Sequence, residues 1–105
     1  MQEKYEIQIS LRAKNDLINI VKYIKDELKE PSIAEKYASI IKEKIRDLEY
    51  NPQRYSIVDN NAIKDLQVRK LIIKRYIIFY RVSENKRIVI IDRILYGASN
   101  WINEL

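Results

Sequence analysis

The spacing of the apolar residues changes once along this 105-residue chain, from a helical period to a strand-like one. Between residues 11 and 48 the apolar side chains recur every three or four positions, which is the spacing of one helix face. Beyond residue 61 they are mostly β-branched or aromatic and occur in nearly continuous runs. A helical part followed by a sheet part is the pattern of an α+β fold.

A short strand and two helices are predicted in the first half of the chain. Apolar and polar side chains alternate over residues 5–9, and Ser10 follows as a suitable N-cap. A helical stripe then continues to about residue 28. Ser32, with Glu35 three residues later, forms a capping-box pattern that predicts the start of a second helix. The linker between the helices is short, so we expect an antiparallel helical hairpin.

Three strands are predicted in the second half, near residues 66–73, 76–82 and 87–96. The turn at residues 83–86 joins the last two as an antiparallel hairpin. The expected order is therefore β-α-α-β-β-β. We expect the helical hairpin to pack on one face of a mostly antiparallel four-stranded sheet, in a single domain over residues 1–105.

The positive charge is concentrated in the sheet part. Residues 62–97 hold nine Lys or Arg against three Asp or Glu, whereas residues 1–61 hold eleven of each. A basic sheet beside a neutral helical part indicates an anionic partner that meets the sheet. The same cations can also be explained as a solvated strand edge that discourages pairing. The candidate target-binding cations are Arg69, Lys70, Lys74, Arg75, Arg81 and Arg93.

Several kinds of site are excluded or disfavoured by composition. The chain has no Cys and no His, which removes disulfides, thiolate metal sites and the side chain best suited to acid–base work at neutral pH. It has no carboxylate metal cluster and no glycine-rich phosphate loop, so we expect neither a metal nor a cofactor. No apolar run is long enough to span a membrane, and the N-terminus is charged. We therefore expect a cytoplasmic protein without a membrane partner.

The last predicted hairpin carries apolar side chains on both faces. This distribution follows when Val82 is paired with Arg87 across the turn. The helical hairpin can cover only one of the two apolar faces. The other face is expected to bind a partner, unless the loop or a C-terminal turn that carries Trp101 covers it. The expected partner-binding residues are Ile77, Phe79, Ile90 and Ile94.

Motifs in several segments follow one another in a characteristic order. The most specific are Tyr76-Ile77-Ile78-Phe79-Tyr80-Arg81-Val82 and Arg93-Ile94-Leu95-Tyr96-Gly97; the others are Tyr5 to Ser10, Ala13 with Asp16-Leu17, Tyr23-Ile24, Ala34 and Tyr37, Leu48 to Pro52 with Arg54-Tyr55, and Val68-Arg69-Lys70-Leu71. Together they resemble the RelE/ParE superfamily of toxins from type II toxin–antitoxin modules. The resemblance implies the β-α-α-β-β-β order and a toxin held inactive by a cognate antitoxin, which would cover the apolar face.

The two branches of that superfamily differ in target. RelE-like members cleave messenger RNA on the ribosome, and ParE-like members poison DNA gyrase. The RelE-like ribonucleases use two lysines, two arginines and a tyrosine at positions that can be traced here. Lys70 matches one lysine, whereas Val68, Ile77, Ser99 and Leu105 occupy the other four positions. The resemblance therefore favours the ParE-like branch, with gyrase as the target.

Two alternatives stay open. In the first, the chain is a metal-independent, ribosome-dependent mRNA endonuclease whose catalytic groups come from shifted positions. In the second, it is a non-catalytic nucleic-acid-binding domain whose basic sheet binds phosphates directly. Whether the chain is an enzyme is left undecided by the sequence. The candidate catalytic residues are Arg69, Lys70, Lys74, Arg75 and Arg81.

Overall fold

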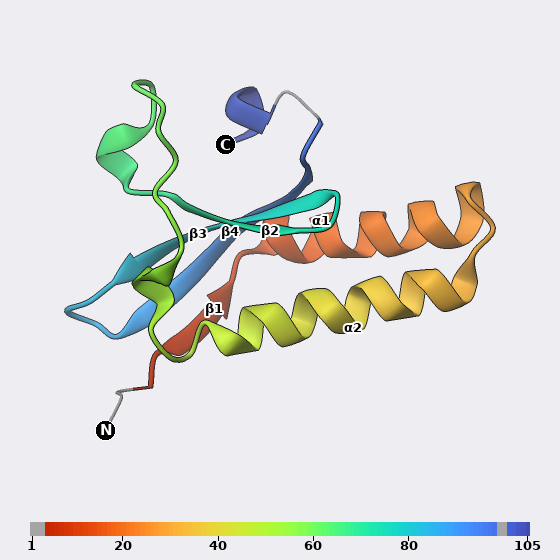
Figure 1. Ribbon diagram of the computed structural model, residues 1–105, viewed down its shortest axis with the longest axis horizontal. Helices are drawn as coiled ribbons and strands as arrows, with labels where there is room; N and C mark the ends of the chain where they lie inside the picture. The colour runs from red at the N-terminus through yellow and green to blue at the C-terminus, as the bar shows by residue number, and fades with distance from the viewer. Residues whose placement is uncertain (1–3, 99–100) are drawn as a thin grey trace.

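The computed structural model describes residues 4–98 and 101–105 (Figure 1). Its helices and strands are β1 (Glu6–Ile9), α1 (Leu11–Lys22), α2 (Pro31–Asp47), β2 (Arg69–Ile73), β3 (Tyr76–Ser83) and β4 (Ile88–Tyr96). A π-helical turn at Tyr23–Glu27 extends α1, and short 3₁₀ turns lie at Pro52–Arg54, Lys64–Leu66 and Trp101–Glu104. The predicted α+β fold and its β-α-α-β-β-β order are confirmed.

The four strands form one mixed sheet in the order β1-β4-β3-β2. β1 pairs with β4 in parallel, and the other two pairs are antiparallel. The hairpin of α1 and α2 lies on one side of this sheet (Figure 1). No helix in the described ranges is long and apolar enough to cross a membrane.

Ser10 joins β1, α1 and β4. Its Oγ accepts a 3.0 Å hydrogen bond from the backbone N–H of Ala13, which is the predicted N-cap. The same hydroxyl donates to the carbonyl oxygen of Asp92 at 2.9 Å, and the Ser10 amide donates to Ile91. The first turn of α1 is thereby fixed against β4.

The second helix begins differently from the prediction. Glu30 is the N-cap residue of α2, and no side chain caps this helix end. Pro31 takes the first helical position, where its missing N–H costs nothing and its fixed φ already suits a helix. Ser32 therefore lies inside the helix, and the predicted capping box is wrong.

The main core fills the space between the helices and one face of the sheet. Each helix contributes small and branched side chains, and the sheet contributes alternate residues of its four strands. Phe79 and Tyr80 are both fully buried, but on opposite faces, because successive side chains of a strand alternate. The buried members of the main core are Tyr5, Ala13, Ile20, Ile24, Ala34, Ile41, Ile45, Leu48, Leu71, Ile73, Tyr76, Ile78, Tyr80, Val89, Ile91 and Ile94.

A second, smaller core covers the other face of the sheet. The Trp101 ring packs on Phe79 with 5.0 Å between ring centroids, and the predicted docking of the C-terminal turn is confirmed. The expectation that this face is open to a partner is therefore wrong, because the 58–68 loop and the C-terminal turn cover it. This second core contains Val58, Val68, Ile77, Phe79 and Leu95, with Ile63, Trp101 and Leu105 packed against them.

The β3–β4 hairpin has a different register from the predicted one. Val82 pairs with Val89 rather than with Arg87, because four residues, 84–87, form the turn. This shift of two residues leaves the side chains near the turn on their predicted faces, since the side-chain period of a strand is two.

A β-bulge reverses the faces farther along β4. The neighbours Phe79 and Tyr80 pair with β4 residues two positions apart, and Asp92 is the extra residue between them. Beyond the bulge, Ile94 lies in the main core with 1% of its surface exposed. The predicted placement of Ile94 beside Phe79 is therefore wrong, because it assumed an unbroken alternation along β4.

Candidate functional site

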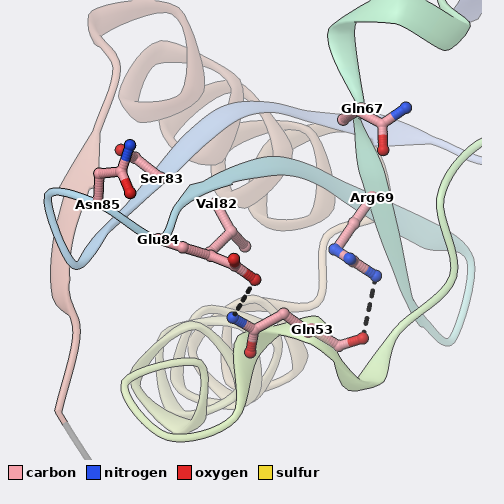
Figure 2. Close-up of a pocket in the computed structure, with 7 residues that line it drawn as sticks. All are labelled: Gln53, Gln67, Arg69, Val82, Ser83, Glu84 and Asn85. Carbon is pink, nitrogen blue, oxygen red and sulfur yellow. Dashed lines mark hydrogen bonds between the residues drawn. The ribbon is translucent and has the colours of Figure 1, made fainter.

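The Arg69 side chain is bound to backbone oxygens of the loop that precedes β2. Its guanidinium donates to the backbone carbonyl oxygen of Gln53 at 2.9 Å (Figure 2). It also donates to the carbonyl oxygen of Tyr55 at 2.6 Å, and thus holds the loop against β2. The Gln53 side chain donates in turn to Glu84 and to the Tyr5 hydroxyl. Arg69, Gln53 and Glu84 line a polar pocket of about 450 Å³, and Arg69, the one cation in its lining, is already bound to backbone oxygens. The pocket is lined by Gln53, Gln67, Arg69, Val82, Ser83, Glu84 and Asn85.

Arg81 is held in an ion pair at the bulge. Its Nε and one terminal nitrogen donate to the two carboxylate oxygens of Asp92, at 2.8 and 2.9 Å. This bidentate geometry satisfies most of the guanidinium and raises the pKa of Arg81, chiefly through the hydrogen bonds to Asp92. Both partners belong to the second face of the hairpin, beside the C-terminal turn.

Arg93 is held still more firmly. It donates to both carboxylate oxygens of Asp16 in α1, at 2.7 and 2.8 Å, and to the carbonyl oxygen of Glu104. The side chains of Arg93 and Asp16 are only 15% and 11% exposed. Hydrogen bonding to Asp16 raises the pKa of Arg93. The Asp16 carboxylate also accepts the Ile94 amide at 2.9 Å, at a point of β4 that lies beyond the end of β1.

The other three candidate cations lie along the β2–β3 hairpin. Lys74 and Arg75 form the turn and are exposed, and Lys70 is on the strand leading to it. Lys74 lies 5.9 Å from the centre of the Tyr37 ring, a cation–π distance. Within residues 4–98 and 101–105, the side chains of these three residues form no hydrogen bond or ion pair. They are the candidate cations that are available to a partner.

The five candidate catalytic residues do not converge. Arg69 shares its sheet face with Tyr80, whereas neighbouring Lys70 is paired with Phe79 on the opposite face. Lys74 and Arg75 lie at the far end of β2, and Arg81 is bound to a carboxylate. Base and acid catalysis of RNA cleavage needs such groups within hydrogen-bond reach of one reacting atom.

The two buried tyrosines of β3, Tyr76 and Tyr80, are poor substitutes for the missing acid–base groups. Burial raises the pKa of Tyr80 to about 12, and it also raises the pKa of Tyr76. The Tyr80 hydroxyl is occupied as well, because it donates to the carbonyl oxygen of Pro52 at 2.6 Å. In the described part of the chain, no three carboxylates lie close enough together to hold a metal ion.

The predicted antitoxin-binding residues are mostly inaccessible. Ile77 is 8% exposed and Phe79 is fully covered by the second core, while Ile94 belongs to the main core. Ile90 is partly exposed. An antitoxin therefore cannot contact three of these four side chains in this conformation, and their role in binding stays a prediction.

An apolar groove that the sequence analysis missed lies between β1 and the two helices. It has a volume of about 540 Å³, and its floor is formed mainly by isoleucine and leucine. Ile18 is 62% exposed and Ile9 is 39% exposed at this groove. The sequence signal was Ile18, which stands next to the buried stripe of α1 rather than on it. The groove is lined by Ile7, Ile9, Ala13, Lys14, Leu17, Ile18, Lys42, Ile45, Arg46, Glu49 and Ile94.

Two solved toxin–antitoxin systems share this fold. A chain of the RelBE2 toxin–antitoxin complex from Mycobacterium tuberculosis superposes with a TM-score of 0.64 at 19% identity, over 94% of this chain and 98% of that one. A chain of the chromosomal ParDE system from P. aeruginosa superposes with a TM-score of 0.70 at 20% identity, over 89% and 96%. At these identities the likeness concerns the fold.

The sequence comparisons assign the family. No curated protein matches the chain. A family model described as the ParE toxin of the type II toxin–antitoxin system, parDE, matches residues 7–101, which is nearly the whole chain. The chain therefore belongs to the ParE toxin family of type II toxin–antitoxin systems.

Proposed function

We propose that this toxin arrests growth by binding a protein target, DNA gyrase, and that it does not cleave RNA. The observation that carries the proposal is the dispersal of the candidate catalytic cations. Arg69 is bound to backbone oxygens, and Arg81 is bound to Asp92. The remaining candidate cations lie on different faces and at different ends of the sheet. A protein-binding toxin needs no convergent acid and base, so this arrangement is sufficient for it.

Family membership supports the same target. The ParE-like branch, which the strand motifs favour, poisons DNA gyrase, and the family model that matches the chain is that of the ParE toxin. Lys70, Lys74 and Arg75, the available cations, provide a charged edge for contact with a macromolecule. Cations at an interface increase the rate of association and select partners more than they add affinity.

We also propose that a cognate antitoxin neutralises the toxin by binding the apolar groove. The groove is rimmed by the exposed cations Lys14, Lys42 and Arg46, whereas its one carboxylate, Glu49, is paired with Lys4 at 3.0 Å. An apolar floor with a positive rim is complementary to an amphipathic acidic segment. The chain's own tail covers the other apolar face, so that face is the weaker candidate.

The free edge of β1 adds main-chain bonding to this groove. The amides of Glu6 and Ser10 donate to β4, so the alternation of the strand turns those of Ile7 and Ile9 to the outer edge. The preceding outward amide, Tyr5, already donates to the carbonyl oxygen of Glu49. An extended antitoxin segment can continue this pattern along the groove.

Inducible expression in bacteria tests the target. DNA synthesis and protein synthesis are followed by separate pulse labels after induction, with the Lys44→Glu variant as a control at an exposed helix position. Early loss of DNA synthesis with induction of the DNA-damage response supports gyrase. Early loss of protein synthesis with cleaved messenger RNA supports the ribonuclease alternative. Binding of the purified protein to free RNA or DNA, steeply weakened by salt, without growth arrest supports a nucleic-acid-binding module.

A further inference from the structure

A second hollow lies at the opposite end of the helical hairpin from its connection to β1. Its volume is about 650 Å³, and it is bounded by α1, the π-helical turn, the start of α2, and the ends of β3 and β4. We call it the tyrosine groove because four tyrosines line it. Its lining includes Tyr23, Tyr37, Arg75, Tyr76 and Tyr96, with Ile20, Ile24, Leu28 and Ile33.

The aromatic side chains form a connected row. Tyr76 packs edge-on against Tyr37 on one side and against Tyr96 on the other, with 5.8 Å between ring centroids in both pairs. Tyr76 is 9% exposed and forms the base, while Tyr23 and Tyr96 are 52% and 45% exposed at the margins. Leu28 and Ile33, 52% and 41% exposed, extend the apolar surface. Contiguous exposed apolar surface of this kind marks an interaction site.

The rim of the tyrosine groove next to the sheet is positively charged. Arg75 lines the groove and is exposed, and the Lys74 ammonium lies over the Tyr37 ring. The one carboxylate in the lining, Asp16, is neutralised by its bidentate pair with Arg93. Arg75 and Lys74 therefore leave an excess of positive charge at this rim, which suits a partner that brings carboxylates.

The local backbone shows that the groove is held in shape. The amide of Leu28 donates to the carbonyl oxygen of Tyr23, five residues earlier, so the helix is widened where these two side chains meet the groove. Single π-helical turns inside helices occur frequently at functional sites. On the opposite wall, the Gly97 amide donates to the carbonyl oxygen of Arg75 at 2.8 Å and fixes the β2–β3 turn.

We propose that the tyrosine groove is the surface that engages the target protein, and that it takes a segment presenting an apolar side chain next to carboxylates. This inference rests on the proposed function in that it assumes a protein target. Tyrosine and arginine are, with tryptophan, the side chains enriched among the residues that dominate binding energy at protein interfaces, and the groove presents both. The groove shares only Ile94 with the apolar groove assigned to the antitoxin, which is otherwise lined from β1 and the other end of the helices.

A protein segment fits this groove better than a nucleic acid. Tyr76 is held between two other rings and is almost fully buried, so it is not available for stacking with a base. The floor contains the aliphatic residues Ile20 and Ile24, and two cations at one rim are few for a phosphate backbone. An apolar floor with a charged rim is the usual anatomy of a protein interface.

Two substitutions test the proposal without disturbing the core. Tyr23→Ala and Arg75→Glu change exposed side chains, so the thermal unfolding midpoint should stay close to that of the wild-type protein. Lys44→Glu, exposed on α2 and outside both grooves, is the control for charge reversal. Growth arrest on induction and the concentration of purified protein that inhibits DNA gyrase are measured for all three. We expect both substitutions in the groove to weaken inhibition by about tenfold or more, as for residues that dominate an interface.

The outcomes separate this inference from the proposed target. If the wild-type protein blocks protein synthesis and not gyrase, the proposed target is wrong, and growth arrest still reports whether the groove is needed. Loss of arrest in both groove variants, with antitoxin binding retained, supports the groove as the target surface. Retained arrest in both variants overturns the inference. Loss of antitoxin binding with retained arrest also overturns the inference, because it assigns the groove to the antitoxin. A selective loss of single-stranded RNA binding in the groove variants overturns the inference in favour of a nucleic-acid partner.

Discussion

The backbone amide of Gly97 donates a 2.8 Å hydrogen bond to the carbonyl oxygen of Arg75, which ties the end of β4 to the β2–β3 turn. A Cβ atom at position 97 would lie 3.3 Å from that oxygen and 3.5 Å from Cδ1 of Ile77. The chain's single glycine therefore lets the end of β4 approach the β2–β3 turn closely at the wall of the tyrosine groove.

Replacing Gly97 with alanine should move this turn. We expect Gly97→Ala to lower the free energy of unfolding by roughly 1 kcal/mol, because the added methyl crowds the Arg75 carbonyl and Ile77. Chemical denaturation measures the loss. Growth arrest should weaken as Arg75 is displaced, while antitoxin binding stays unchanged. An unchanged stability together with full growth arrest would show that the close approach has no consequence for the groove.

Among the ion pairs of the residues that the structure describes, the loss of Asp16 should be the most destabilising single change. Asp16→Ala leaves the largely buried Arg93 without its carboxylate and the Ile94 amide without its acceptor. We expect a loss of about 3 kcal/mol in the free energy of unfolding, as for a broken buried pair. Urea denaturation tests this, with Lys4→Gln as the control. Lys4 is 65% exposed in its ion pair with Glu49, so this pair should contribute little to the free energy of unfolding.

Arg69 should prove structural rather than catalytic. Arg69→Ala removes two hydrogen bonds to the carbonyl oxygens of Gln53 and Tyr55, and we expect it to lower the free energy of unfolding by about 1 to 3 kcal/mol. The amount of folded protein needed for growth arrest should stay the same. Thermal unfolding and a dose series of induced expression measure the two effects. If Arg69→Ala folds as well as the wild type and abolishes arrest, Arg69 belongs to a functional site.

Tyr80 should make stability sensitive to alkaline pH. An unfolded tyrosine has a pKa of about 10, whereas burial raises the pKa of Tyr80 to about 12. The folded state therefore favours the neutral hydroxyl of Tyr80. The contribution of this preference to the free energy of unfolding is complete below about pH 10 and is lost as the pH rises to about 12.

Tyr80→Phe separates this effect from other alkaline titrations. The variant loses the hydrogen bond to the Pro52 carbonyl, which should cost about 1 kcal/mol at neutral pH. It should also lose stability less steeply than the wild type between pH 10 and pH 12. Denaturation series at several pH values measure both slopes. Parallel slopes for the two proteins would contradict the assigned role of Tyr80.

Ile18 should distinguish neutralisation from toxicity. It is 62% exposed in the apolar groove, so Ile18→Glu should fold normally. The introduced carboxylate would repel an acidic antitoxin segment and disrupt the apolar floor, so we expect antitoxin affinity to fall by at least about tenfold. Titration calorimetry measures the affinity, and coexpression shows whether the antitoxin still rescues growth. Rescue as efficient as for the wild type would place the antitoxin elsewhere; Tyr23→Ala, in the tyrosine groove, is the matched control.

The fold follows closely from local sequence patterns. The helical stripes, the Ser10 cap and the β-branched runs each report on neighbouring residues, so they identify the elements and their order. The capping box at Ser32 failed because two start signals compete there, and Pro31 at the first helical position prevailed.

The faces of the last hairpin depend on features that local patterns do not carry. One extra residue, Asp92, reverses the alternation beyond it, and nothing in the apolar pattern marks a bulge whose ion pair with Arg81 forms only in the sheet. For the same reason the sequence located the cations of the candidate site without showing which are occupied. Arg93 and Asp16 are 77 residues apart, and their pairing is a property of the fold.

Inhibition of gyrase by the purified protein tests the central claim most directly. The protein is added to a supercoiling reaction with DNA gyrase, and in parallel to a translating extract in which the messenger RNA is followed by primer extension. We predict that supercoiling falls with increasing wild-type protein, that Arg75→Glu weakens this effect, and that the messenger RNA stays intact. Undiminished supercoiling with new cleavage of the messenger RNA would contradict the account and identify the chain as a ribosome-dependent endonuclease.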